Sequence, residues 1–370
     1  MTTSITNIRF NIFMRICFAI DTLGPGGAER VVTLLANKFA MKGHVVFLAA
    51  FSLEKLESFY KVDDKVCFIP LAQNKRNKLK KIVFFRNFLK DNKIDIVVSF
   101  LPQINIYSFF ATSFSKTIHI PSLRSNPKSD IKGPLRRFFR WLAFMTSDGC
   151  VFQTRDALMF FGNRIAKKST VIHNPLNNSI QFFEGDVFDN RIVSVGRFSI
   201  EKNKKSLILA FELFSRSHPS YSLVLYGDGY QIEEMKELCN ELNLDNKVLF
   251  LGNDPDWYKK EIHSRMFVLS SNYEGMPNAL MEAMATGIPC VSTDCPIGGP
   301  KELIVDGVNG LLVPVGDVSL LSIAMTRIAD DRTLALRLKN QNKNMIKDYS
   351  TDVICDEWEL FISSKVNKKR

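Results

Sequence analysis

The feature that most constrains this chain is a repeated alternation of short β-branched or apolar runs with longer amphipathic segments. The alternation extends from residue 15 to residue 173, and it starts again after a turn-rich segment at residues 174–190. Parallel strands joined by helices produce such a pattern, because each crossover helix covers one face of the sheet. The sequence therefore predicts an α/β protein with two Rossmann-like domains.

The expected elements fall into two groups. In the first half, strands are expected at residues 15–20, 45–50, 65–70, 94–100, 118–123, 149–153 and 170–173, and the clearest helices at residues 28–41, 78–91 and 135–145. In the second half, strands are expected at residues 191–195, 221–226, 247–251, 266–270, 289–293 and 310–313. We expect domains at residues 1–175 and 176–348, since 370 residues exceed one ordinary core.

The charge balance favours anionic partners. Lysine and arginine number 49 against 38 acidic residues, a net charge of +11, which suits nucleic acid, anionic lipid or phosphorylated ligands without choosing among them. The seven cysteines form no CxxC pair and no cluster with histidine, which argues for a reducing compartment and against a structural zinc site.

Two apolar stretches have the hydropathy of targeting or membrane segments. Residues 8–20 contain Arg9 and Arg15, and no small-residue cleavage signal follows, so no signal peptide is expected. Residues 96–115 carry no charge and are long enough to span a bilayer, but Pro102 and polar residues interrupt them. A buried strand, a turn and a helix are expected there instead.

Three local motifs follow expected strands. The first is residues 24–30 (GPGGAER), where Gly26 and Gly27 open an expected helix. Glycines let the backbone approach a ligand and a helix N-terminus favours negative charge, so the motif suits a phosphate or a developing oxyanion. A tight turn without a ligand explains it equally well. It is not the dinucleotide fingerprint, because Glu29 stands at the third glycine position.

The second motif pairs Arg197, at the end of an expected strand, with Lys202. Around a strand-to-helix turn these two cations can converge on a diphosphate and neutralise the charge that develops on a departing nucleoside diphosphate. The alternative is a solvated basic helix start, to which Lys204 and Lys205 also contribute.

The third motif, residues 272–291 (NYEGMPNALMEAMATGIPCV), is the most specific. Glu274 precedes an expected helix with Pro277 at its first position, and Glu282 lies about one turn inside that helix. Two carboxylates so placed can bind the hydroxyl groups of a donor hexose and of a ribose. Stabilisation of the helix dipole explains either glutamate singly, but not the whole string.

Together the motifs resemble glycosyltransferase family 4, retaining enzymes with the GT-B fold. The resemblance rests on the E-x7-E element, the GR-x4-K pair, the GGAERV turn and the VIHNP strand, and it covers nearly the whole chain. It implies two domains that face each other across a cleft, and a helix in residues 349–370 that crosses back to the first domain. It also implies catalytic roles for Arg197 and Lys202 on the donor diphosphate and for Glu274 on the transferred sugar, with Glu282 on the ribose.

The resemblance implies further contacts to a UDP-sugar. The backbone of residues 275–278 would cradle the sugar and phosphate, the glycine turn would face them, and the strand end at residue 252 would lie by the uracil. The donor-binding residues so implied are Gly26, Gly27, Gly252, Asn253, Gly275, Met276, Pro277 and Asn278. Many members also place a histidine near the sugar; this region here reads SLRSNP, and the resemblance leaves open whether Arg124 replaces that histidine. His119, inside an expected strand, is interpreted as structural.

No metal or cofactor is implied, because the arginine–lysine pair neutralises the diphosphate in this family. Asp254 and Asp256 match the D-x-D metal motif of the other large glycosyltransferase fold. Their position before Trp257 and an expected helix favours helix capping over metal binding.

Two basic and aromatic stretches of the first domain, residues 75–90 and 135–144, have the composition of helices that lie on anionic membranes. A solvated face and a nucleic-acid patch are the alternatives. We favour membrane binding, expect no nucleic-acid partner, and predict a cytoplasmic protein that is peripheral at the inner face of the cytoplasmic membrane.

The functional hypothesis is a retaining transferase that moves a hexose or N-acetylhexosamine from a UDP-sugar to a saccharide acceptor, lipid-diphosphate-linked or free. The SLRSNP and DCPIGGPKELI segments resemble those of bacterial enzymes that assemble O-antigen lipopolysaccharide, capsule or glycoprotein oligosaccharides. A UDP-sugar epimerase of similar fold and a non-catalytic nucleotide-sugar-binding protein are the alternatives.

Overall fold

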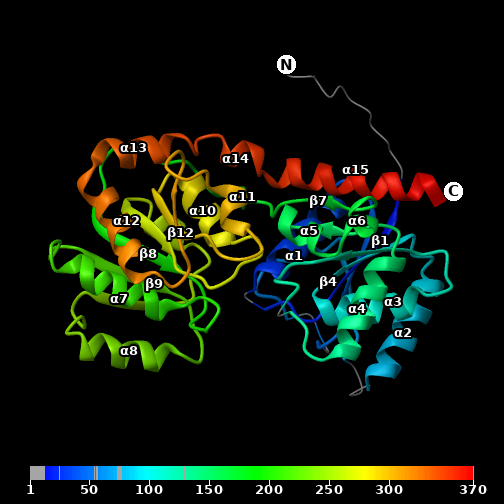
Figure 1. Cartoon of the computed structure of the whole chain (residues 1–370). Helices are drawn as coiled ribbons and strands as arrows, with labels where there is room; N and C mark the ends of the chain where they lie inside the picture. The colour runs from blue at the N-terminus through cyan, green and yellow to red at the C-terminus, as the bar shows by residue number, and fades with distance from the viewer. Residues whose placement is uncertain are drawn as a thin grey trace. The chain divides into compact units, whose positions relative to one another are not determined.

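The computed structural model describes residues 13–369 except residues 25, 54, 56, 73–76 and 129. The chain forms two compact units. The first contains the chain up to Gln153, Leu158–Pro175 and the segment from Thr351 onward, and the second contains Thr154–Ala157 and Leu176–Ser350. Each unit is built on one parallel sheet with helices packed around it (Figure 1). The expected α/β class with two parallel sheets is confirmed.

A seven-stranded sheet organises the first unit, in the order β3-β2-β1-β4-β5-β6-β7. Its strands are β1 (Arg15–Ile20), β2 (Val45–Ala50), β3 (Cys67–Pro70), β4 (Ile96–Phe100), β5 (Ile118–Ser122), β6 (Val151–Phe152) and β7 (Thr170–Val171). All neighbouring pairs are parallel, and β4 is buried along its whole length, as expected of a strand covered on both faces. The strand order turns back on itself between β1 and β4, which makes the carboxyl ends of these two strands a topological switch point.

Seven helices lie wholly or partly in the described part of the first unit, and residues 155–157 of one of them, α5, belong to the second unit. They are α1 (Gly27–Met41), α2 (Lys78–Asp91), α3 (Pro102–Thr112), α4 (Pro134–Thr146), α5 (Arg155–Phe160), α6 (Asn163–Ala166) and α15 (Thr351–Lys369). Residues 96–115 form β4, α3 and the adjoining turns, as expected. Among the described helices, none combines the length and apolarity needed to cross a bilayer.

The last helix, α15, belongs to the first unit, where it packs against α1 (red in Figure 1). The side chain of Trp358 is fully buried, with its ring centroid 6.1 Å from that of Phe100 at the end of β4. At the rim of this contact, Lys42 forms ion pairs with Asp356 and, at 2.6 Å, with Glu359. The apolar contact provides most of the stabilisation, because exposed ion pairs contribute little.

A six-stranded parallel sheet organises the second unit, in the order β10-β9-β8-β11-β12-β13. Its strands are β8 (Asp189–Val195), β9 (Ser222–Tyr226), β10 (Val248–Gly252), β11 (Ser264–Leu269), β12 (Cys290–Thr293) and β13 (Leu311–Val313). Its helices are α7 (Lys204–Ser215), α8 (Ile232–Glu241), α9 (Trp257–Lys260), α10 (Asn278–Thr286), α11 (Gly299–Leu303), α12 (Val318–Asp330), α13 (Arg332–Asn340) and α14 (Met345–Asp348).

Successive side chains of β9 enter two different cores. Leu223 and Leu225 lie in one apolar cluster, whereas Val224 and Tyr226 lie in another on the opposite face of the sheet. Burial on both faces explains why this strand has no polar–apolar alternation in the sequence. The switch point of this sheet lies between β8 and β11, so the loops that follow these two strands meet at one edge.

Replacing Trp358 by alanine is expected to destabilise the first unit by about 3–5 kcal/mol, because the substitution leaves a large cavity against Phe100. Leu360→Ala is the matched control, since Leu360 lies on the same helix and is 55% exposed. Urea unfolding followed by circular dichroism measures both. Equal unfolding midpoints for the two variants would contradict the packing role of Trp358.

Candidate active site

Two loops meet at the switch point of the second sheet. Residues 196–203 connect β8 to α7, and residues 270–277 connect β11 to α10. Because β8 and β11 are parallel neighbours, both loops leave the same edge of the sheet side by side. The second and third sequence motifs therefore lie together.

Hydrogen bonds fix the two loops to each other. The side-chain amide of Asn272 donates to the carbonyl oxygen of Ile200 at 2.7 Å, and its backbone N–H donates to that of Glu201 at 2.8 Å. Asn203, which has a left-handed backbone with φ 45°, donates to the side-chain oxygen of Asn272 at 3.0 Å. Ser270 donates to the carbonyl oxygen of Asn203 at 3.0 Å. These hydrogen bonds hold the two loops in a fixed relative position.

This arrangement brings two predicted catalytic residues into contact. The ammonium of Lys202 lies 2.5 Å from Oε1 of Glu274, and the hydroxyl of Ser271 donates to the same oxygen at 2.6 Å. Glu274 is buried, with 8% of its surface exposed. Arg197, by contrast, is exposed, and no ion pair connects it to a carboxylate of the described residues. The sequence did not identify Ser271 as a partner of Glu274.

Glu282 is the fifth residue of α10 and is also buried. Its Oε2 accepts a hydrogen bond from the indole Nε1 of Trp257 at 2.9 Å. Trp257 is the first residue of α9, so a helix that follows β10 orients this carboxylate. Sequence reasoning singled out Trp257 only as a neighbour of Asp256 and did not predict this contact.

The start of α10 differs from the expectation by one residue. Pro277 has φ −79° and ψ 101°, so it is the N-cap, and the first helical residue is Asn278. The expected place of Pro277 at the first helical position is therefore wrong, because its ψ lies outside the helical region. The side chain of the N-cap Pro277 makes no capping hydrogen bond, and the first turn of α10 carries the positive end of the helix dipole.

A glycine that the sequence analysis did not select supports the loop before α10. A Cβ atom on Gly299 would lie 1.6 Å from the carbonyl oxygen of Gly275 and 3.0 Å from Cδ of Pro277. Only glycine therefore allows α11 to begin so close to residues 275–277.

At the end of β10, the carbonyl oxygen of Gly252 accepts a hydrogen bond from the N–H of Gly227 at 2.7 Å, and Asn253 next to it is exposed.

In the first unit, the glycine turn follows β1 at the switch point of its own sheet. Gly26 is the N-cap of α1, and Gly27 is its first residue; Pro25 lies outside the described residues. The carboxylate of Glu29 folds back over this turn, since its Oε2 lies 2.0 Å from the position of a Cβ atom on Gly26. The turn therefore combines a helix N-terminus with an acidic side chain that the sequence analysis treated only as a break in the glycine pattern.

Arg124 forms a stacked arrangement within the first unit. Its guanidinium lies 4.9 Å from the ring centroid of Phe100 and 5.5 Å from that of Trp358, and it donates to Asn174 at 2.8 Å. Burial lowers the pKa of Arg124 to about 9, which leaves it cationic at neutral pH. Arg124 therefore joins the end of β4 to α15, a contact that the sequence did not predict.

His119 is structural, as expected. It is 4% exposed within β5, and its Nε2 lies 2.9 Å from the hydroxyl of Ser99. Burial lowers its pKa to about 3, so it is neutral at physiological pH.

Comparison with known proteins identifies the family. The profile of Glycosyltransferase Family 4 matches residues 25–179, and that of Glycosyl transferases group 1 matches residues 180–345. A Campylobacter jejuni protein, GalNAc-alpha-(1->4)-GalNAc-alpha-(1->3)-diNAcBac-PP-undecaprenol alpha-1,4-N-acetyl-D-galactosaminyltransferase, is 30% identical over 369 residues, covering 96% of this chain and 99% of the relative. The chain belongs to glycosyltransferase family 4. The predicted family and the prediction of a transferase enzyme are confirmed.

Two further comparisons support the family and the fold. A second Campylobacter jejuni protein, N-acetylgalactosamine-N,N'-diacetylbacillosaminyl-diphospho-undecaprenol 4-alpha-N-acetylgalactosaminyltransferase, is 28% identical over 351 residues, covering 89% of this chain and 94% of the relative. The crystal structure of Anabaena HepE in complex with UDP-glucose has a TM-score of 0.79 at 18% identity, covering 95% of this chain and 100% of that one. The predicted GT-B fold is confirmed.

The D-x-D sequence of this glycosyltransferase forms a turn held by lysines. Oδ1 of Asp254 accepts from the backbone N–H of Asp256 at 2.8 Å, and its Oδ2 pairs with Lys260 at 2.6 Å. Lys260 holds the pKa of Asp254 below its ordinary value. Asp256 pairs with Lys259 at 2.8 Å and, although it is the N-cap of α9, its side chain accepts no capping hydrogen bond. The expectation that these aspartates cap the helix is therefore wrong, and Asp254 forms an Asx turn before α9 instead.

Lys204 of the glycosyltransferase is buried, with 3% of its surface exposed, so it is not part of a solvated helix start as the alternative interpretation required. Its ammonium donates to the hydroxyl of Ser194 at 2.8 Å. Burial, aided by the Lys202 cation and opposed by Glu274, lowers the pKa of Lys204 to about 7. Lys205, the next residue, is exposed.

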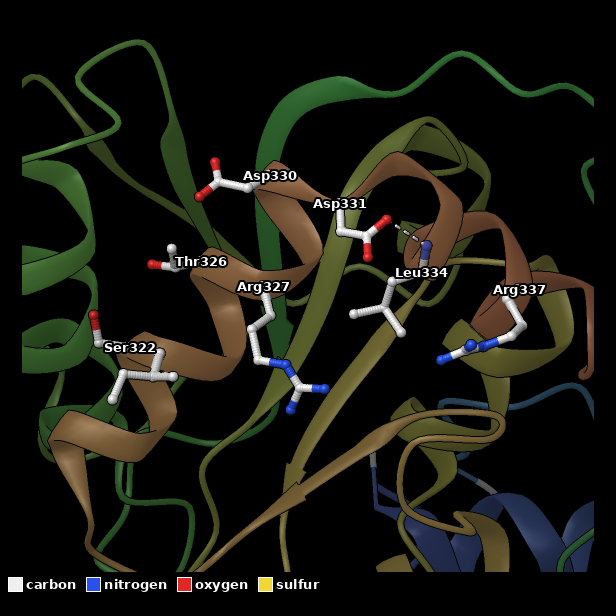
Figure 2. Close-up of a pocket in the computed structure, with 8 residues that line it drawn as sticks. Ser322, Thr326, Arg327, Asp330, Asp331, Leu334 and Arg337 are labelled. Carbon is white, nitrogen blue, oxygen red and sulfur yellow. Dashed lines mark hydrogen bonds between the residues drawn. The ribbon is translucent and has the colours of Figure 1, made fainter.

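A hollow of about 460 Å³ on the second unit lies apart from these residues. Figure 2 shows it on α12 and α13, where Asp331 accepts from the backbone N–H of Leu334 at 2.8 Å and so caps α13. Arg327 and Arg337 line it as exposed side chains. None of the predicted site residues contributes to this hollow.

Lys204 predicts a specific dependence of stability on pH. The folded-state pKa of about 7 lies below the ordinary 10.5, so the unfolded chain binds more protons between these values. The unfolding free energy of the second unit is therefore expected to rise as the pH rises from about 7 to 10.5. Below about pH 7 the buried Lys204 is protonated, and the protein is destabilised by the full free energy needed to bury that charge. Lys204→Met is expected to flatten the rise, and Lys205→Met to preserve it, in urea unfolding at several pH values. An unchanged profile in Lys204→Met would exclude this role.

The lysine partners of Asp254 and Asp256 predict that transferase activity survives chelation. Within the described residues, no three histidine, cysteine, aspartate or glutamate side chains cluster as metal ligands do. Activity measured before and after EDTA dialysis is expected to be equal. Loss of activity that manganese restores would contradict the prediction.

Proposed function

We propose that this enzyme transfers an N-acetylhexosamine or hexose from a UDP-sugar, with retention of anomeric configuration, to a saccharide linked through diphosphate to a polyprenol. The arrangement that carries the proposal is the Lys202–Glu274 pair at the switch point, with Glu282 one turn inside α10. The two relatives named for undecaprenol-linked acceptors and N-acetylgalactosaminyl transfer support this class of acceptor and sugar. The related fold with bound UDP-glucose supports the nucleotide.

The geometry suits stabilisation of a departing diphosphate. Lys202, exposed Arg197 and the N-terminus of α10 supply positive charge at one edge of the sheet. As the bond from the anomeric carbon to the phosphate oxygen breaks, the electron pair stays on that oxygen, where these groups lower its energy. The acceptor hydroxyl attacks the anomeric carbon from the same face, and its proton passes to the leaving phosphate oxygen.

The carboxylates serve recognition in this proposal. Both Lys202 and Ser271 contact Oε1 of Glu274, so Oε2 of Glu274 can accept hydroxyl groups of the transferred sugar. Glu282 accepts the ribose hydroxyls, with its orientation fixed by Trp257. The backbone of residues 275–278, held in place by Gly299, borders the phosphates.

We also propose peripheral binding to the inner face of the cytoplasmic membrane. On α4, Leu135, Phe138 and Trp141 are 65%, 52% and 42% exposed, beside the exposed Arg136 and Arg137. Apolar side chains that enter the interface and cations that attract anionic lipid form such a surface together. Residues 75 and 76 of the other predicted stretch lie outside the described residues. Asn77 is the N-cap of α2, and residues 78–90 lie within α2.

Calorimetric titration with UDP, GDP and ADP tests the donor site without an acceptor. UDP is expected to bind best, and Glu282→Ala is expected to weaken it about 10- to 100-fold through loss of a charged hydrogen bond. Glu241→Ala on α8 is the matched control. UDP affinity equal in all three proteins would contradict the assignment of Glu282.

Transfer from UDP-N-acetylgalactosamine, UDP-galactose and UDP-glucose to a synthetic undecaprenyl-diphosphate saccharide then tests the reaction.

A further inference from the structure

The first unit contains an apolar groove of about 860 Å³ that the donor chemistry does not use. It lies between α2, the end of α3 and α4, which are neighbours in the structure (Figure 1). Leu79 and Val83 line it from α2, Phe110 and Phe114 from the end of α3, and Leu142 from α4. Its volume and apolar lining are typical of small-molecule sites.

The groove exposes more apolar surface than folding alone explains. Leu79 is 74% exposed, Val83 is 58% exposed, and Phe114 is fully exposed. Phe114 also has a left-handed backbone, with φ 62°, directly after a helix, a position where glycine or asparagine is usual. A phenylalanine there satisfies neither its backbone preference nor burial, which points to a ligand that covers it.

Arg86 of α2 fixes the end of α3, which forms one wall of the groove. Its guanidinium donates to three carbonyl oxygens at the end of α3, those of Phe110 at 3.2 Å, Ala111 at 3.2 Å and Ser113 at 2.6 Å. A cation at a helix C-terminus is stabilising, so this contact fixes α3 against α2. On the other side, the ring of Phe110 packs edge-on against Phe139 of α4 at 5.2 Å. Contacts of α3 with α2 and with α4 therefore fix the walls of the groove.

Two of the helices that line the groove also carry exposed cations. Lys78, Lys80 and Lys90 on α2 and Arg136 on α4 are exposed. An apolar groove beside exposed cations suits a molecule with a hydrocarbon chain and an anionic headgroup. A lipid diphosphate combines both.

We propose that this groove binds the polyprenyl chain of the lipid-diphosphate-linked acceptor, a proposal that rests on the proposed function. The groove reaches Thr117 and Asp148, which precede β5 and β6, so it extends to the amino-terminal edge of the sheet. Ligands of open parallel sheets bind at the carboxyl edge, so we place the diphosphate of the acceptor there. The 11 residues of α3 between these edges span about 16 Å. A long chain can therefore fill the groove while its diphosphate stays at the carboxyl edge, whereas a short chain cannot.

A direct binding test uses Trp141, which is 42% exposed on α4, next to Leu142 of the groove. The other two tryptophans of the chain, Trp257 and Trp358, are buried. Undecaprenyl phosphate brominated at its double bonds is expected to quench this fluorescence, and Trp141→Phe to abolish the change. Because Trp141 is also proposed to meet the membrane, the titration is made in detergent without vesicles, and unbrominated undecaprenyl phosphate is expected to reverse the quenching. Equal reversal by the same amount of unbrominated phospholipid would assign the groove to bilayer lipid and overturn the proposal.

Transfer kinetics supply the second test. Val83→Asn and Leu142→Asn are expected to raise the KM for an undecaprenyl-linked acceptor at least about tenfold, since each places a polar group against the chain. The KM for a short-chain acceptor with the same saccharide and diphosphate is expected to stay unchanged. Leu360→Asn, which alters a leucine on α15 about as exposed as Val83, controls for general effects of lost surface apolarity. Equal changes for both acceptors would overturn the proposal.

Different results would contradict the proposed transferase function and the proposed polyprenyl groove. If the native protein neither binds UDP nor transfers sugar to either acceptor, the proposed function is wrong. The quenching experiment requires neither UDP nor turnover, so absence of quenching in a protein that transfers sugar would overturn the groove alone.

Discussion

Parallel pairing of β8 with β11 is the constraint on which the candidate site depends. Neighbouring parallel strands end at the same edge, and their connections leave in opposite directions, so the loops after them stand side by side without a helix between them. Lys202 and Glu274 are 72 residues apart in the chain, yet this pairing places them in contact. The Asn272 hydrogen bonds then fix the loops, so that the ion pair is a consequence of the sheet rather than its cause.

Preorganisation of this kind suits an enzyme that stabilises a leaving group. A buried carboxylate needs partners, and Glu274 has Lys202 and Ser271, while Glu282 has Trp257. Each carboxylate is therefore held in place by a residue from another element. A donor that enters meets groups whose orientation is already set, which reduces the reorganisation required during the reaction.

The sequence predicted the elements well because hydrophobic periodicity reports burial directly. All thirteen strands of the described residues fall at or within about two residues of the expected ranges. It also placed the Arg197–Lys202 motif and the E-x7-E element after strand ends, but it did not predict the contact between Lys202 and Glu274. What it missed depends on three-dimensional neighbours. Lys204 has the composition of a surface residue, but the inward face of α7 buries it. Trp257, Gly299 and the stacking of Arg124 each depend on an element distant in sequence, which no local pattern encodes.

The position of α15 has a consequence for biosynthesis. The second unit is almost continuous in the chain, whereas the first is completed only by the helix that begins at Thr351. During synthesis, residues 176–350 can therefore fold while the earlier strands still lack the helix that covers Phe100 and Arg124. Until α15 has left the ribosome, that surface remains an apolar site open to chaperones. The last domain to finish folding is thus the one whose synthesis began first.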